Sequence, residues 1–149
     1  MQTLGAVIEE SDLSMIRAMG ANFSDSLLNH STLENALCRR TDFTGAAIGN
    51  VKAREADFSD GVFNNADLCA AVFVKSNCTG ASFKKADCHG ARFAKATLEN
   101  ADWQGAVMIG VTAPDVASLA TGIQPLPLEP IPYLQIGQTA PVNSAVLSP

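Results

Sequence analysis

The stretch ADFSDGVFNNADLCAAVFVK (56–75) repeats one pattern every five residues: a small residue, a second residue, a large apolar residue and two mostly polar ones. From Ile8 to Met108 an apolar residue recurs at every fifth position without a slip. This central position holds all seven phenylalanines and the only tryptophan of the chain. A fixed short period of this kind indicates a solenoid, in which each repeat packs on its neighbours.

A period of five matches neither the 3.6 residues of a helix turn nor the two-residue alternation of a strand. The chain is therefore expected to turn a corner every five residues. If four such units close one coil, residues twenty apart lie above one another at the interstrand spacing of about 4.8 Å. One such set is wholly aromatic: Phe23, Phe43, Phe63, Phe83 and Trp103. The sequence thus predicts a coil of four five-residue units.

The predicted core combines the central residues with the small residues that stand two positions before them. Two large residues at the small position, Ile16 and Val51, coincide with the only alanines at the centre, Ala18 and Ala53. Such volume compensation is expected where both positions point into one closely packed interior. The residues predicted to be most deeply buried are Phe23, Phe43, Phe63, Phe83, Trp103, Leu28, Ile48, Leu68, Phe58, Phe73 and Phe93.

The units ANFSD (21–25), ADFSD (56–60), ADLCA (66–70) and ADWQG (101–105) follow the motif A-(D/N)-(L/F)-x-x. The chain resembles the pentapeptide-repeat family over about residues 6–111. The resemblance implies an all-β fold, a right-handed quadrilateral β-helix, here of about five coils. We expect an N-terminal cap or first coil over residues 1–20, the β-helix over 21–111 and a proline-rich extended tail over 112–149.

The predicted tail differs sharply in composition from the repeats. All seven prolines lie at or beyond Pro114, and no Lys or Arg follows Val111. The string QPLPLEPIPYL (124–134) is expected to be extended, close to polyproline II. Its apolar side chains leave three alternatives open: the tail packs on its own rod, docks into a second copy or a partner, or stays disordered. Self-association through the tail is one of these expectations.

Composition and charge narrow the class of protein. The chain is 47% hydrophobic and carries a formal charge of −5. Glu9, Glu10 and Asp12 stand where a secretory signal would carry basic residues, and no apolar run is long enough to span a membrane. We expect a cytoplasmic protein that has no cofactor. We also expect that it contacts neither membranes nor nucleic acid directly.

Candidate reactive residues are few. Cys38, Cys78 and Cys88 occupy central positions, where a buried cysteine acts as a small hydrophobe. Cys69 points outward, with His89 twenty residues later, so the two could form half of a metal site. No further ligand follows in their column, and no nucleophile motif occurs elsewhere. We therefore predict neither a metal site nor an enzyme.

The first functional prediction is an interaction scaffold for an unknown protein partner. Exposed apolar side chains would form the contact surface. The residues assigned to it are Val62, Val72, Val74, Ile109, Leu128, Ile131 and Tyr133.

Two alternatives remain. The best-known members of the family imitate duplex DNA and act on DNA gyrase, which requires acidic rows along the rod. Here residues 21–110 sum to only −1, which disfavours gyrase as a partner. The string PIPYLQIGQ (130–138) is similar to the opening of PAAR-like proteins of type VI secretion spikes, which would make the chain a secretion-associated adaptor or effector component.

Overall fold

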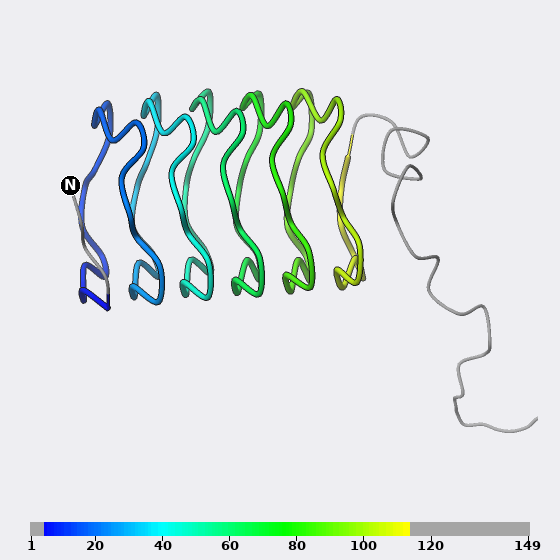
Figure 1. Cartoon of the computed structure of the whole chain (residues 1–149), viewed down its shortest axis with the longest axis horizontal. Coiled ribbons are helices and arrows are strands. Elements are labelled where there is room, and N and C mark those ends of the chain that lie inside the picture. Colours follow the sequence, from blue (N-terminus) through cyan, green and yellow to red (C-terminus); the bar gives the residue numbers. More distant parts are fainter. Residues whose placement is uncertain (1–4, 114–149) are drawn as a thin grey trace, which may run out of the picture.

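The computed structural model describes residues 5–113, which form a row of stacked coils (Figure 1). The predicted tail beyond Ala113 and the first four residues lie outside the described residues. Within 5–113 the chain has no helix and no extended strand, because each five-residue unit contributes one bridging residue between turns. None of the described residues therefore belongs to a helix that is long and apolar enough to cross a bilayer.

The register of the bridges shows the length of a coil. Every bridge is parallel and joins residues twenty apart, from Val7 with Leu27 at the first coil to Arg92 with Thr112 at the last. From Ile8 to Phe93 the central N–H of each unit donates to the next coil, as Phe43 does to the Val62 carbonyl at 2.7 Å. From Leu27 onward the N–H one position before the centre donates to the preceding coil, as Asp42 does to the Ala21 carbonyl at 2.9 Å. Each coil thus consists of four units, and the inner coils are hydrogen-bonded on both sides.

The corners depend on a left-handed residue at the fifth position of every unit. The φ values there lie between 55° (Asn50) and 75° (Gly105). For a residue with a Cβ this conformation costs roughly 1–2 kcal/mol, and only Gly, Asn and Asp adopt it readily. Lys75 and Met15 nevertheless adopt it, because the ladders on both sides of the coil determine the path of the chain.

The polar second residue of the motif closes the turn. Its side-chain oxygen accepts a hydrogen bond from the backbone N–H two residues later, at 2.9 Å for Asp42 and Thr44. Where the second residue is Ala47, the side chain of Asn29 in the preceding coil accepts the bond from Gly49 at 2.8 Å instead. The residues that close their own turns are Asp12, Asn22, Asp42, Asp57, Asp67, Asn77, Asp87 and Asp102.

The interior is filled by two aromatic stacks. Phe43, Phe63 and Phe83 stack face to face with centroids 5.0 and 4.9 Å apart, and Trp103 continues the column 4.3 Å from Phe83. In the second stack Phe73 lies on Phe93 with centroids 5.1 Å apart, and Phe73 meets the first column edge-on at 88° to Phe63. The eleven side chains expected to be deepest are between 0% and 2% exposed. Val51 and Ala53, a compensating pair, are both fully buried.

Residues 5–20 follow the same pattern as the coils behind them. Their second-position residues bridge the next coil, as in the pairs Asp12–Thr32 and Arg17–Leu37. The core side chains Ile8, Leu13 and Ile16 are only half-buried, because no other described residue covers the N-terminal side of the first coil. This end of the rod is consequently less well packed than the middle.

Candidate functional site

The outer surface is the part of the described chain that is open to chemistry. The first and third residues of each unit point into the packed core, so the second, fourth and fifth residues face solvent. A site must therefore combine residues within one unit with residues one coil away. Each coil presents four faces, and residues twenty apart form a column along one face.

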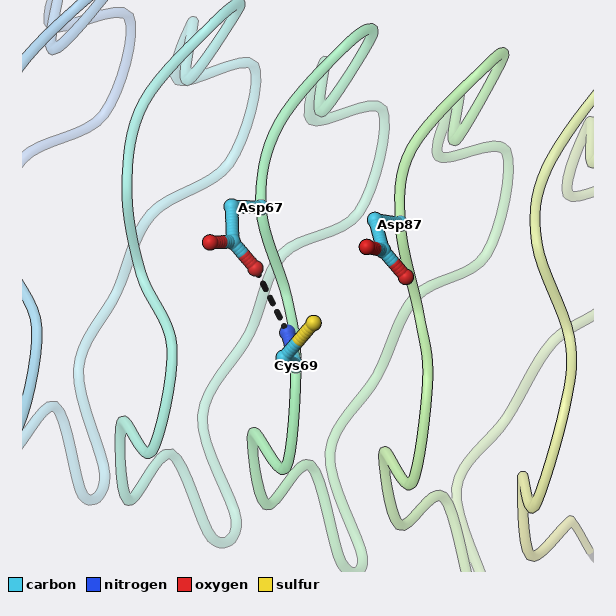
Figure 2. Close-up of side chains that lie close together, drawn as sticks. All are labelled: Asp67, Cys69 and Asp87. Atoms are coloured by element: carbon cyan, nitrogen blue, oxygen red, sulfur yellow. Dashed lines mark hydrogen bonds between the residues drawn. The ribbon is translucent and has the colours of Figure 1, made fainter.

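One cluster combines three possible metal ligands: Asp67, Cys69 and Asp87 (Figure 2). Their ligand atoms lie within 4.8 Å of one another. Asp67 and Cys69 come from one unit, and Asp87 bridges Asp67 from the next coil. His89, the expected neighbour of Cys69, touches this region through its backbone, with its carbonyl accepting from the Ala70 N–H at 2.9 Å. The structure thus brings Cys69 together with two carboxylates, and the imidazole is not part of the cluster.

The electrostatics of the cluster keep the thiol protonated. Burial, hydrogen bonding to Asp67 and Asp87, and the charges of both carboxylates raise the pKa of Cys69 to about 12. A nucleophile or a metal ligand has to be a thiolate, so this cysteine is poorly suited to either role at neutral pH. Asp67 and Asp87 also accept the backbone N–H groups of Cys69 and His89 at 3.0 and 3.1 Å. Asp67 and Asp87 therefore close the turns of their own units, and the protonated thiol of Cys69 is a hydrogen-bond donor to these carboxylates.

The other three cysteines are buried in the core. Burial raises the pKa of Cys38, Cys78 and Cys88 to about 12 in each case. Thiols of this kind are inert packing groups.

The apolar residues expected on the surface have different exposures. Val62 and Val72 are half-buried and Ile109 is 51% exposed. The expectation for Val74 is wrong, because it is only 7% exposed. Its column continues with Arg54 and Ala94, one coil away on either side. Leu128, Ile131 and Tyr133 lie outside the described residues.

Basic and acidic residues lie on different faces of the rod, although the net charge of residues 21–110 is close to zero. Three units from successive coils lie above one another and form what we call the basic face: residues 51–55, 71–75 and 91–95. Its charged residues are five bases and one acid: Lys52, Arg54, Lys75, Arg92, Lys95 and Glu55. The neighbouring acidic face comprises the units that end at residues 10, 30, 50, 70, 90 and 110. It has no Lys or Arg and carries Glu9, Glu10, Asp67 and Asp87.

Ion pairing leaves the basic face uncompensated. Among residues 5–113 the ion pairs are Arg39–Asp57 at 2.8 Å and Lys84–Asp102 at 3.6 Å, both outside this face. Glu55 and Lys75, which lie in one column one coil apart and have opposite charge, form no ion pair. Both are exposed corner residues, and a surface pair offers only about 0–1 kcal/mol to hold two long side chains together. Sequence reasoning missed the sorting because charges were summed, whereas counting them by position within a twenty-residue coil would have revealed it.

Comparisons with known proteins identify the repeats and the fold. The pentapeptide repeat model matches residues 21–60, 62–100 and 86–113, with eight copies. A pentapeptide repeat protein from the Arabidopsis thaliana thylakoid lumen is 24% identical, with a TM-score of 0.51 and 72% of each chain covered. Rfr23 from the cyanobacterium Cyanothece 51142 is 17% identical, with a TM-score of 0.46 and coverage of 75% of this chain and 87% of its own.

Full-length QnrB1, a plasmid-mediated fluoroquinolone resistance protein, is 20% identical over 80% of this chain and 83% of its own, with a TM-score of 0.29. No curated protein sequence matches the chain. At 24% identity the thylakoid-lumen structure shows the fold alone, a repeat solenoid. The family model covers more than half of the chain, and the chain therefore belongs to the pentapeptide repeat family.

Proposed function

We propose that this chain is a non-catalytic scaffold that binds a protein partner along its outer faces. The supporting observation is that two adjacent faces carry opposite charge while the interior is filled. The acidic face bears Asp67 and Asp87 without any base, and the basic face bears Lys75 and Lys95 with a single acid. A rod of this kind offers columns of charged side chains that are spaced about 4.8 Å apart along each face.

Faces of opposite charge fix the orientation of a binding partner more than they raise its affinity. Complementary potentials speed the encounter between partners and reject a partner that arrives with the wrong face. The rigid ladder adds to this because the side chains do not have to be brought together on binding. The proposed role is therefore to hold a partner in one orientation.

The experiment compares face variants in a pull-down of the full chain. One variant reverses Lys75 and Lys95 to glutamate, and a matched control reverses Arg40 and Lys85, which occupy the same fifth position on other corners. Circular dichroism verifies that each variant is folded. We expect a specific partner to be lost with the Lys75 and Lys95 variant and retained with the control. Identical captured proteins for all folded variants would contradict binding by a defined face.

The two alternative functions gain nothing from the described residues. Imitation of DNA requires continuous acidic rows, yet the acidic face has Asp67 and Asp87 only in the coils between Asn50 and Val107. A gyrase supercoiling assay that the protein leaves unaffected would exclude this alternative. The string 130–138, which suggested a secretion role, lies outside the described residues.

A further inference from the structure

We propose that the basic face is the docking site for the chain's own C-terminal segment, residues 114–149. Because the occupant is part of the same chain, a docked segment leaves the acidic face free for an outside partner and opens the basic face to one only when the segment is released. It is carried by the unbalanced charge of the face, by the place where the chain leaves the solenoid and by the chemistry of the segment that follows.

The basic face is a continuous, unpartnered sheet surface. Lys52 bridges Val72, Val72 bridges Arg92, and Arg92 bridges Thr112, so one column runs over the last coils. Along the same face, the two preceding coils carry acid instead, at Asp12 and Glu34. Positive charge is thus confined to the part of the face nearest the exit of the chain.

Like charges on this face are held close together. Lys75 and Lys95 occupy one column, one coil apart, and the Lys75 N–H donates to the Ala94 carbonyl at 2.9 Å. Neither side chain has an ion-pair partner among the described residues. Repulsion between neighbouring cations at a protein surface is modest, yet it is relieved by any carboxylate that settles between them. An acidic occupant is therefore the one that fits.

The solenoid delivers the C-terminal segment to this face. The Thr112 carbonyl accepts from the Phe93 N–H at 2.6 Å, and the Thr112 N–H donates to the Ala91 carbonyl at 3.1 Å. The chain accordingly leaves the last coil on the basic face itself. The residues that follow include Asp115 and Glu129 but no Lys or Arg.

The repeat register cannot continue through this segment. Pro125 and Pro130 fall at the fifth position, where every described residue has a positive φ, whereas a proline ring holds φ near −65°. Pro127 and Pro132 fall at the second position, whose N–H would have to donate to the preceding coil. The segment is thus excluded from forming a further coil, and its apolar side chains need another surface.

The segment is long enough to cover the face. Lys52 lies three coils before Thr112, which corresponds to about 14 Å along the rod. Residues 125–136 in a polyproline II conformation would span about 37 Å. The eleven residues between Ala113 and Pro125 suffice to turn the chain back. The segment therefore has the reach to bring Glu129 to Lys75 and Lys95.

The test uses the full chain at low protein concentration. Zero-length carbodiimide crosslinking followed by mass spectrometry should join Asp115 or Glu129 to Lys52, Lys75 or Lys95 within one chain. Hydrogen exchange should be at least about tenfold slower for amides of residues 126–136 than in an unprotected peptide. Crosslinks that lead instead to Lys84 or Lys85, on another face, would overturn the proposal.

Charge exchange separates docking from general destabilisation. The face variant Lys75→Glu/Lys95→Glu should lose the protection of residues 126–136, and adding Asp115→Lys/Glu129→Lys should restore it. The control Arg40→Glu/Lys85→Glu changes the same fifth positions on other corners and should leave the protection intact. Equal loss in the control, or no rescue by the exchanged charges while circular dichroism shows an intact rod, would contradict docking on this face.

Two other occupants give different results, and either one overturns the proposal. Crosslinks and protection that appear only as the protein concentration rises would assign the face to the segment of a second copy. Rapid exchange of residues 126–136 in a folded wild-type chain would leave the face open to an outside partner.

Discussion

Replacement of Phe63 by alanine tests whether the aromatic column is the main source of cohesion between coils. The ring is fully buried and lies 5.0 Å from Phe43 and 4.9 Å from Phe83 in parallel stacks. Phe58 and Phe73 meet it edge-on at 5.5 and 5.7 Å. Phenylalanine-to-alanine changes in cores cost about 3–5 kcal/mol, and more when the cavity cannot close.

The structure places Phe63 at the upper end of that range. The coils on either side are held by ladders at fixed spacing, with the Phe63 N–H donating to the Ser82 carbonyl at 2.7 Å. The cavity would therefore persist, and two stacked pairs would be lost with it. We expect a loss of about 5 kcal/mol in unfolding free energy. Phe23→Ala is the matched control with an expected loss of about 3 kcal/mol, because within residues 5–113 Phe23 stacks on Phe43 alone, at 5.4 Å.

The assay is urea unfolding followed by circular dichroism and by the fluorescence of Trp103, the only tryptophan. In the wild-type chain the two transitions should coincide. In Phe63→Ala the weakened middle should let the coils on its N-terminal side unfold at lower urea than the coil that contains Trp103, because repeat solenoids gain stability from interfaces between neighbours. Equal losses for Phe63→Ala and Phe23→Ala would refute the stacking argument.

Three further outcomes follow from single side chains. Asp87→Asn should lower the raised pKa of Cys69 and so speed its alkylation at pH 8, measured by mass spectrometry; an unchanged rate would show that the carboxylate does not restrain the thiol. Burial tends to raise the pKa of Asp57, but hydrogen bonds from Arg39 and Ser59 outweigh it and the pKa is lowered. A lowered carboxyl pKa adds stability above about pH 4 that is lost as the pH falls through the folded-state value, so Asp57→Asn should flatten the acid limb of stability in urea titrations, and an unaltered limb would contradict this. Met15→Asn should raise the unfolding free energy by about 0.5–1 kcal/mol because asparagine tolerates the left-handed φ of 62°, whereas Met15→Leu should leave it unchanged in the same titration.

The interior was predictable from the sequence because its period is short and its composition uniform. Every fifth residue is apolar, so the inward positions could be assigned without knowing the coil, and the aromatic set from Phe23 to Trp103 then indicated twenty residues per coil. Where a large residue takes the small position of a unit, a small residue takes its centre, as with Val51 and Ala53, and both are buried. The inward positions could therefore be assigned correctly even in units that depart from the motif.

The outer surface was less predictable because its neighbours are distant in sequence. Val74 is only 7% exposed although it occupies an outward position of its unit, so that position alone did not reveal its burial. Arg39 pairs with Asp57, eighteen residues later, by reaching diagonally across to the next coil. The exposure of a surface side chain and its ion pairs depend on residues in the neighbouring coils. The sequence of a single five-residue unit does not show these neighbours.

The separation of a five-residue core period from a twenty-residue surface period gives insertions and deletions unequal effects. Removal of one unit, such as residues 61–65, keeps every later core position in phase but rotates all later side chains to the adjacent face. Lys75 would then continue the column of Asn50, and the basic face would be divided. Removal of a whole coil, such as 56–75, leaves every remaining column aligned. Whole coils can thus be removed from this rod without disturbing the alignment of charged residues along its faces. Removal of a single unit moves all later charged residues to a different face.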